Sequence, residues 1–319
     1  MSEWIAVRVA EKRDEARDIA SFVLEKADGT DLPHWEPGAH VDVRLPGDIV
    51  RQYSLCGPAV DTRRYRIGVL RDSAGRGGSR AIHDDVAAGD TLSISPPRNL
   101  FPLDVQEQAL LFAGGIGITP ILAMAHHLSA KGDRFDMHYC VRSADRAAFA
   151  DQLGGDDFAG RVSLHCDDDP DTRLDVDALL GGTPVVGTHI YVCGPDGFMD
   201  HVLNAAKKAG WPDSQVHFER FSAPVSQPGE DGAFKIAVEG SDRVIEVAAG
   251  QSAIDALAAA GIEIPVSCEQ GICGTCLTDI AGGIPDHRDM FLSDAEKAAN
   301  DCFTPCCSRA LTPRLTIRI

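Results

Sequence analysis

The sequence predicts a multidomain protein in which an antiparallel β-barrel, a parallel α/β domain and a small α+β domain follow one another. Short strand-like runs fill residues 1–103, apolar runs alternate with helix-like segments over 104–226, and six of the ten cysteines lie beyond residue 267. At 319 residues the chain is too long for one ordinary domain. The segment 222–232, rich in Ser, Pro, Gly and acids, predicts a linker before a third domain at 233–319.

The barrel is predicted because short runs of β-forming residues recur between Gly, Pro and Asp. These runs are WIAVRVAE, IASFVLEK, AHVDVRL, RQYSLCG, RYRIGVL and TLSISPP. RQYSL, at 51–55, is followed by GRGGSRAIHD, at 75–84, whose glycines predict a helix start. Free N–H groups and a hydroxyl at that start can hold a phosphate that Arg51 also neutralises. An exposed, half-polar strand is the simpler alternative.

The parallel α/β domain is predicted from strand-like and helix-like segments in alternation. The apolar run ALLFAG leads into a glycine cluster and the helical stretch TPILAMAHHLSAKG. The apolar runs FDMHYCV, RVSLHC and THIYVCG follow, separated by helix-like segments.

Two motifs in this domain indicate a dinucleotide site. AGGIGITP, at 113–120, lacks the full G-x-G-x-x-G fingerprint, but Gly114, Gly115 and Gly117 remove side chains where a pyrophosphate approaches a helix N-terminus. A tight strand-to-helix turn would explain the same residues. YVCGPDGFM, at 191–199, favours binding because a second strand would end on the same sheet edge, where ligands bind.

The motif CEQGICGTC carries the sharpest chemical signal in the chain. Cys268, Cys273 and Cys276 have the C-x4-C-x2-C spacing of plant-type [2Fe–2S] proteins, and Cys306 follows thirty positions later. Soft thiolates suit iron–sulfur chemistry, and the two intervening glycines let the loop wrap closely around a cluster. A four-cysteine zinc site is the alternative, but zinc sites usually pair two C-x-x-C knuckles and only one is present.

The fourth ligand is open to three candidates on spacing alone, Cys302, Cys306 and Cys307. Pro305 favours Cys306, because its fixed φ would hold the approach rigid. Cys307 should point elsewhere if the segment is extended, since successive side chains alternate between faces. Cys302 is expected to pack or to remain a free thiol.

The charge distribution argues against nucleic acid as a partner. The formal net charge is −18, and residues 104–232 hold 20 acidic side chains against 9 basic ones. Binding to a phosphate backbone needs a basic footprint.

The amino-terminal residues alternate apolar and charged side chains without the apolar region of a signal peptide, and no run approaches the ~20 apolar residues of a membrane helix. We therefore expect a soluble, cytoplasmic protein that does not bind membranes. We also expect it to be a monomer.

The order of these motifs resembles the phthalate dioxygenase reductase family, within the ferredoxin–NADP reductase superfamily, over nearly the whole chain. Vanillate O-demethylase reductases look similar, and YCVRSADRAAF, HFERF, PDHRD and PCCSRA are further matching stretches. The resemblance implies a flavin-binding β-barrel at 1–103, an NAD-binding α/β domain at 104–226 and a plant-type β-grasp ferredoxin domain at 233–319.

The resemblance also implies an activity. The chain would be an NADH-dependent oxidoreductase with FMN and a [2Fe–2S] cluster, which passes single electrons to a separate oxygenase. A Rieske-type enzyme that hydroxylates or demethylates an aromatic acid is the expected partner, and a cytochrome P450 or another hydroxylase is the alternative. A non-enzymatic metal-binding module is the rival from another class. No catalytic side chain is assigned, because hydride transfer requires no side-chain acid or base.

Residue roles follow from matching positions. For the flavin, the family pattern matches one strand at Arg51, Tyr53 and Ser54 and a phosphate loop at Gly77, Gly78 and Ser79. It also matches Val69 and Leu70, on a strand whose backbone lines the flavin ring. Thr119 matches a position near the flavin, and Phe221 matches an aromatic residue that covers the ring face. For NAD, Arg142 matches a position near the dinucleotide, beside the motif residues Gly114, Gly115, Gly117, Cys193, Gly194 and Pro195. The pattern places the fourth cluster ligand at Cys306, although Cys307 stands where an aliphatic residue is more usual.

The sequence also favours one flavin and one nicotinamide nucleotide over their alternatives. FMN is predicted over FAD, because the phosphate-binding elements account for one phosphate and no second site for an adenosine is evident. NADH is predicted over NADPH, because RVSLHC runs into Asp167, Asp168 and Asp169. An acidic group there accepts from a ribose 2′-hydroxyl and repels a 2′-phosphate.

Overall fold

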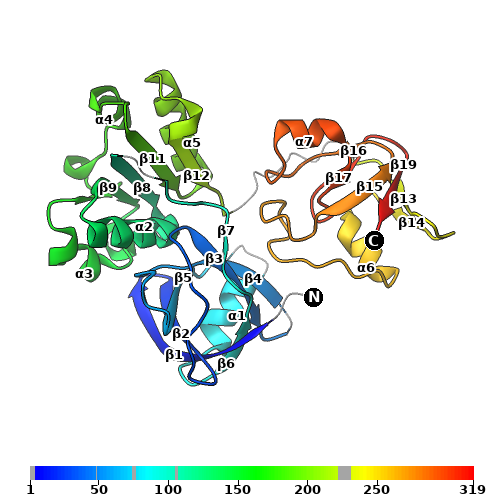
Figure 1. Cartoon of the computed structure of the whole chain (residues 1–319), viewed down its shortest axis with the longest axis horizontal. Helices are drawn as coiled ribbons and strands as arrows, with labels where there is room; N and C mark the ends of the chain where they lie inside the picture. The colour runs from blue at the N-terminus through cyan, green and yellow to red at the C-terminus, as the bar shows by residue number, and fades with distance from the viewer. Residues whose placement is uncertain (1–3, 48, 74–76, 105–106, 222–230) are drawn as a thin grey trace. The chain divides into compact units, whose positions relative to one another are not determined.

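Figure 1 shows a computed structural model of the chain, which describes all residues except 1–3, 48, 74–76, 105–106 and 222–230. The chain divides into two compact units, Met1–Phe221 and Ser222–Ile319. The first unit holds an antiparallel sheet and a parallel sheet, and the second holds a mixed sheet. The three predicted fold types are therefore confirmed. The predicted domain boundary at residue 103 falls inside the first unit.

The antiparallel sheet forms the amino-terminal half of the first unit. Its strand order is β4-β3-β6-β1-β2-β5, with β7 paired to β3. The strands are β1 (Ile5–Ala16), β2 (Ile19–Lys26), β3 (Ala39–Leu45), β4 (Ile49–Ser54), β5 (Arg64–Leu70), β6 (Thr91–Ile94) and β7 (Arg98–Asn99). An antiparallel bridge between Leu55 and Ile67 brings the edge strands β4 and β5 together, so the sheet closes on itself. The helix α1 (Gly78–Asp85) packs Ile82 into the apolar interior.

The parallel sheet forms the other half of the first unit, with strand order β10-β9-β8-β11-β12. Its strands are β8 (Gln108–Gly114), β9 (Arg134–Val141), β10 (Val162–Cys166), β11 (Thr188–Cys193) and β12 (Val216–Glu219). The helices are α2 (Ile118–Lys131), α3 (Ala150–Leu153), α4 (Val176–Gly182) and α5 (Asp196–Lys208). One face of the sheet packs on α2, and the other packs on α4 and α5 in a separate apolar cluster.

The second unit is a mixed sheet of order β14-β13-β19-β15-β17. Its strands are β13 (Phe234–Val238), β14 (Val244–Val247), β15 (Thr278–Gly282), β17 (Cys302–Phe303) and β19 (Arg314–Arg318). A short pair, β16 (Pro285–Asp286) and β18 (Arg309–Ala310), lies apart from it. The helices are α6 (Ala253–Ala259) and α7 (Asp294–Ala299). Strand β13 pairs antiparallel with β14 and parallel with β19, which matches the predicted β-grasp arrangement.

The helices of the described residues are short. The longest of them, α2, has 14 residues, and none is long and apolar enough to cross a membrane.

Candidate functional site

The two glycine motifs of the parallel sheet meet at one edge, as the sequence predicts. Strand β11 pairs in parallel with β8, so Cys193 lies opposite Ala113 where both strands end. The backbones then approach so closely that a Cβ on Gly117 would lie 2.3 Å from the Cys193 carbonyl oxygen. A Cβ on Gly114 would lie 2.7 Å from the Phe198 ring. Gly114 and Gly117 are therefore required for contact between the two motifs.

Gly115 differs from Gly114 and Gly117, because among the described residues, its two chain neighbours aside, no heavy atom lies within 4 Å of the position that its Cβ would occupy. It forms the turn η1 (Gly115–Gly117) between β8 and α2, whereas Ile118 and Thr119 at the start of α2 are buried. Of the three glycines, Gly115 is thus the one whose backbone is open to the approach of another group.

Charged residues stand at the same edge where β9 and β10 end. The Asp167 amide donates to the Val141 carbonyl at 2.9 Å, and the Asp168 amide donates to the Arg142 carbonyl at 3.3 Å. The side chains of Arg142 and Asp167 are exposed. The structure therefore brings these two predicted nucleotide residues together on adjacent strands, beside the glycine turn.

At the other side of the parallel sheet, the end of β12 contacts the barrel. Glu219 ends β12 opposite Cys193, and Ser54 Oγ of the barrel strand β4 donates to Glu219 Oε2 at 3.4 Å. Burial raises the pKa of the Glu219 carboxyl to about 8. Burial also raises the pKa of the Cys193 thiol, with a further contribution from Glu219, so the thiol stays neutral. Glu219 was missed as a site residue, although it stands within the matching stretch HFERF.

Thr119 joins the glycine turn to the barrel strand β5. A Cβ on Gly68 would lie 2.8 Å from the Thr119 Cγ2 methyl, so this threonine packs directly on the strand that continues into Val69 and Leu70. Its hydroxyl donates to the Ile116 carbonyl at 3.1 Å. The predicted flavin positions 54, 69, 70 and 119 consequently lie around the junction between the two sheets. Phe221, at the end of the first unit, is 39% exposed.

The predicted phosphate loop lies beside Arg51. A Cβ on Gly78 would lie 2.6 Å from Arg51 Cγ, so the arginine packs on the first turn of α1. Gly77, at the helix start, has φ +87°, and no side chain of the described residues caps the helix. The Ser79 hydroxyl accepts from the Asp72 amide at 3.1 Å. A cation beside uncapped N–H groups fits a phosphate. Residues 75 and 76 of the motif lie outside the described residues.

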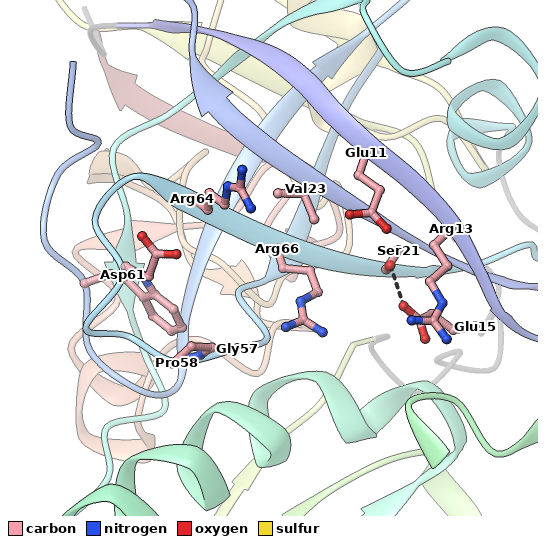
Figure 2. Close-up of a pocket in the computed structure, with 11 residues that line it drawn as sticks. Glu11, Arg13, Glu15, Ser21, Val23, Gly57, Pro58, Asp61, Arg64 and Arg66 are labelled. Carbon is pink, nitrogen blue, oxygen red and sulfur yellow. Dashed lines mark hydrogen bonds between the residues drawn. The ribbon is translucent and has the colours of Figure 1, made fainter. Parts of the chain in front are cut away.

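A cavity of about 330 Å³ lies on the outer face of β1, β2 and β5, away from these positions (Figure 2). Its lining includes three arginines and three acids, and none of the predicted flavin or nucleotide residues. Arg66 donates from Nη1 to Gln152 Oε1 at 3.0 Å and lies over the Phe149 ring. We interpret this region as a contact between barrel and α3.

The four predicted cluster cysteines form two pairs in the second unit. The Cys268 thiol donates to Cys273, and the Cys306 thiol donates to Cys276 and to its neighbour Cys307, which holds the pKa of these three acceptors below the usual range. Cys268 Sγ also accepts from the amides of Gln270 and Ile272, both at 3.4 Å. In the described part of the chain no three His, Cys, Asp or Glu side chains converge on one point as a single metal ion requires. Two thiol pairs suit two irons, each with two thiolates.

The cysteine loop depends on glycine at two positions. Gly271 and Gly274 have φ of +73° and +67°, where other residues are strained. A Cβ on Gly274 would lie 2.3 Å from the Phe291 ring, and one on Gly271 would lie 2.3 Å from Cys307 Sγ. Residues 305–307 form a turn, so the extended segment on which the expected orientation of Cys307 depended is not present, and its sulfur lies against the cysteine loop. Cys302 lies on β17 and pairs with Asp279.

Comparison with known proteins identifies both units. A 2Fe–2S iron–sulfur cluster binding domain matches residues 236–311, and the N-terminal domain of dimethylamine monooxygenase subunit DmmA-like proteins matches 94–216. Vanillate O-demethylase oxidoreductase of Pseudomonas sp. (strain HR199) is 52% identical over 315 residues, covering 98% of this chain and 99% of that protein. Phthalate dioxygenase reductase of Burkholderia cepacia is 39% identical, covering 98% and 97%.

Two solved structures also match nearly the whole chain. The structure of a phthalate dioxygenase reductase, described as modular for electron transfer from pyridine nucleotides to [2Fe–2S], matches with TM-score 0.79 and 39% identity over 99% of this chain and 98% of that one. An intact type IV self-sufficient cytochrome P450 monooxygenase matches with TM-score 0.83 and 38% identity, over 99% of this chain but 41% of its own. The chain therefore belongs to the family of phthalate dioxygenase reductases and vanillate O-demethylase oxidoreductases, the oxidoreductase components of oxygenase systems.

Proposed function

We propose that this protein is an NADH-dependent reductase that holds FMN in its barrel and a [2Fe–2S] cluster in its second unit, and that it supplies electrons to a separate oxygenase. The contact between Ser54 and Glu219 carries the proposal, because it joins the nucleotide edge of the parallel sheet to the barrel strand expected to bind the flavin. Two cofactors bound at these sites would lie at one junction.

The chain's own residues would bind and orient the cofactors. When bound, a flavin supplies the exchange between two-electron chemistry with a nicotinamide and one-electron chemistry with an iron–sulfur cluster. Arg51 and the start of α1 would hold its phosphate, and the open turn at Gly115 would hold the pyrophosphate of NADH. Asp167 would accept from the ribose 2′-hydroxyl at the far end of the edge. Glu219, with its raised pKa, can hold a proton on its carboxyl beside Ser54 at neutral pH.

The second unit would hold the cluster through Cys268, Cys273, Cys276 and Cys306. Their arrangement in two pairs, with amides directed at Cys268 Sγ, supports this ligand set. The amide donors would favour the thiolate form that iron requires.

A Rieske-type oxygenase or O-demethylase acting on an aromatic acid is the partner that we infer. Relatives over nearly the full chain are named vanillate O-demethylase oxidoreductase and phthalate dioxygenase reductase, which supports this class. A cytochrome P450 is the second candidate, because the self-sufficient P450 monooxygenase contains a segment that matches 99% of this chain. Assaying NADH oxidation with a purified oxygenase of each class distinguishes the two.

Spectroscopy of the purified protein tests the central proposal. We expect flavin and [2Fe–2S] absorption bands that both bleach when NADH is added without oxygen. Acid release and chromatography of the flavin should recover one FMN per chain, and stoichiometric FAD would refute that choice. A colourless protein that contains zinc would refute the proposal as a whole.

We also infer a cytoplasmic monomer. None of the ten cysteines, all of which are described residues, is in a disulfide, which suits a reducing compartment. One chain carries every proposed cofactor site, so the transfer from NADH to the cluster needs no second copy. Light scattering that gives the mass of a dimer would contradict the monomer.

A further inference from the structure

The segment that follows β10 is closed into a loop by the hydroxyl of Thr172. Thr172 Oγ1 accepts from the Cys166 amide at 2.9 Å. It donates to the Asp169 carbonyl at 3.0 Å, and the Cys166 carbonyl, at 3.3 Å, is a second acceptor. The Thr172 amide also donates to the Asp169 carbonyl, at 3.1 Å. One side chain therefore ties the last residue of β10 to the middle and the end of the segment 166–172, the closed loop.

A histidine on β10 holds the remaining polar group of Thr172. Because a carbonyl oxygen only accepts, His165 Nδ1 donates to the Thr172 carbonyl, at 2.5 Å. The other ring nitrogen of His165 lies 3.1 Å from His138 Nδ1 on β9. His138 stacks on the Phe112 ring with 5.5 Å between the centroids, and burial lowers its pKa to about 4, so it is uncharged at neutral pH. Two rings thus connect the closed loop to the apolar interior of the parallel sheet.

The closed loop carries the acid that we expect to read the ribose. Asp167 follows Cys166 directly, and its own amide donates to the Val141 carbonyl at 2.9 Å. Its side chain is exposed, whereas Asp169 Oδ1 accepts from the Asp171 amide within the loop at 3.1 Å. The backbone of Asp167 is therefore fixed on both sides while its carboxylate stays accessible to a ligand.

We propose that Thr172 is a specificity-determining positioning residue for the nicotinamide nucleotide, because its hydroxyl fixes the backbone that presents Asp167. The inference rests on the proposed function, in which Asp167 accepts from the ribose 2′-hydroxyl. A carboxylate on a fixed backbone makes that bond without first being ordered, and it stands at a fixed place against a 2′-phosphate. An open loop lets the carboxylate move away, which weakens NADH binding and relieves the repulsion of NADPH.

Variants of the full-length, cofactor-loaded protein test this role. Thr172→Val keeps the shape of the side chain without its hydroxyl, and Thr172→Ser keeps the hydroxyl. Asp167→Asn, alone and combined with Thr172→Val, shows whether the threonine acts through the acid. Flavin reduction by NADH and by NADPH gives kcat and KM for each variant, and amide hydrogen exchange at Cys166 reports whether the loop is closed.

Thr183→Val is the matched control. Thr183 is also half-buried, and its hydroxyl donates to a backbone carbonyl of its own segment, that of Leu179, at 2.8 Å. It follows α4 and precedes β11, so it lies toward the edge of the sheet where the strands begin, opposite the edge that carries Asp167.

We expect Thr172→Val to raise KM for NADH about fivefold with kcat near wild type, and to lower the preference for NADH over NADPH in kcat/KM about fivefold. Exchange at the Cys166 amide should speed up about tenfold, because this amide loses its acceptor. Thr172→Ser should restore most of the wild-type behaviour, and Thr183→Val should match wild type. The double variant should have the preference of Asp167→Asn alone, since a carboxylate that is absent cannot be misplaced.

Wild-type exchange at Cys166 or wild-type nucleotide preference in Thr172→Val would overturn the inference. A double variant in which the two single effects multiply would also overturn it, because Thr172 would then act independently of Asp167. If Thr172→Val fails to fold, His165→Phe removes the bond to the Thr172 carbonyl and keeps an aromatic ring beside His138, with the same expected direction.

The proposed function fails in a different way. A wild-type protein whose flavin is reduced by neither nucleotide would contradict the reductase itself. A wild-type protein that uses NADPH as well as or better than NADH would overturn the inference and leave the reductase intact. The exchange measurement depends on neither nucleotide and tests the closed loop in both cases.

Discussion

Ser54 and Glu219 share a hydrogen bond of 3.4 Å although 165 positions separate them in the sequence. One ends a barrel strand and the other ends a strand of the parallel sheet. The carboxyl group is therefore held at the junction of the predicted flavin and nucleotide positions, where burial raises its pKa to about 8.

The raised pKa of Glu219 predicts a pH dependence of stability. The folded state favours the protonated carboxyl up to about pH 8, whereas the unfolded group ionises near its ordinary value of 4.5. The stabilisation is complete below the unfolded pKa and is lost as pH rises through the folded pKa. Glutamine cannot ionise, so Glu219→Gln should gain stability relative to wild type between about pH 5 and 8. Denaturant unfolding with excess FMN measures this, and parallel pH curves would contradict it.

The proposed ligand set predicts that only one of the last three cysteines is needed to keep the iron–sulfur cluster. Cys306→Ser should lose iron and sulfide, because the Cys306 thiol pairs with Cys276. Cys302→Ser and Cys307→Ser should retain the cluster, since neither residue belongs to the predicted ligand set. Flavin reduction by NADH should persist in all three variants. Metal analysis and reduction of an external one-electron acceptor provide the check, and an unaltered cluster in Cys306→Ser would refute the assignment.

Gly274 and Gly240 form a matched pair for testing the cysteine loop. Both have positive φ, but a Cβ on Gly274 would clash with Phe291 whereas one on Gly240 meets nothing within 4 Å. Gly240→Ala should lower the free energy of unfolding by about 1 kcal/mol through its positive φ alone. Gly274→Ala should cost more and reduce the iron content per chain. Thermal unfolding and iron analysis measure both effects, and equal losses would show that the contact is unimportant.

Asp167 predicts the choice of nucleotide. Its exposed carboxylate should repel a 2′-phosphate, so wild type should prefer NADH over NADPH in kcat/KM. Asp167→Asn should reduce that preference by about tenfold, equivalent to ~1.4 kcal/mol. Asp169→Asn is the control, because Asp169 Oδ1 already accepts from the Asp171 amide at 3.1 Å. Equal or better use of NADPH by wild type would invalidate this prediction.

The sequence by itself determined the order of fold types, because local signals encode them. Period-two runs between turn residues predicted the antiparallel strands, alternating apolar and helical segments predicted the parallel sheet, and the cysteine spacing predicted the cluster loop. The common edge for the glycine and Cys193 motifs followed from the rule that parallel strands end together.

Tertiary structure alone decided which distant residues meet. Glu219 looks like an ordinary acid in the sequence, and only the packing of β12 against the barrel places its carboxyl beside Ser54. The three glycines also differ in their surroundings: Gly114 and Gly117 lie against the segment that follows β11, whereas the Cβ position of Gly115 faces open space. This difference depends on where β11 ends. Cys307 turned toward the cysteine loop because residues 305–307 form a turn, so the alternation expected of an extended segment did not apply. Such contacts arise from backbone segments far apart in the chain, and local patterns carry no information about them.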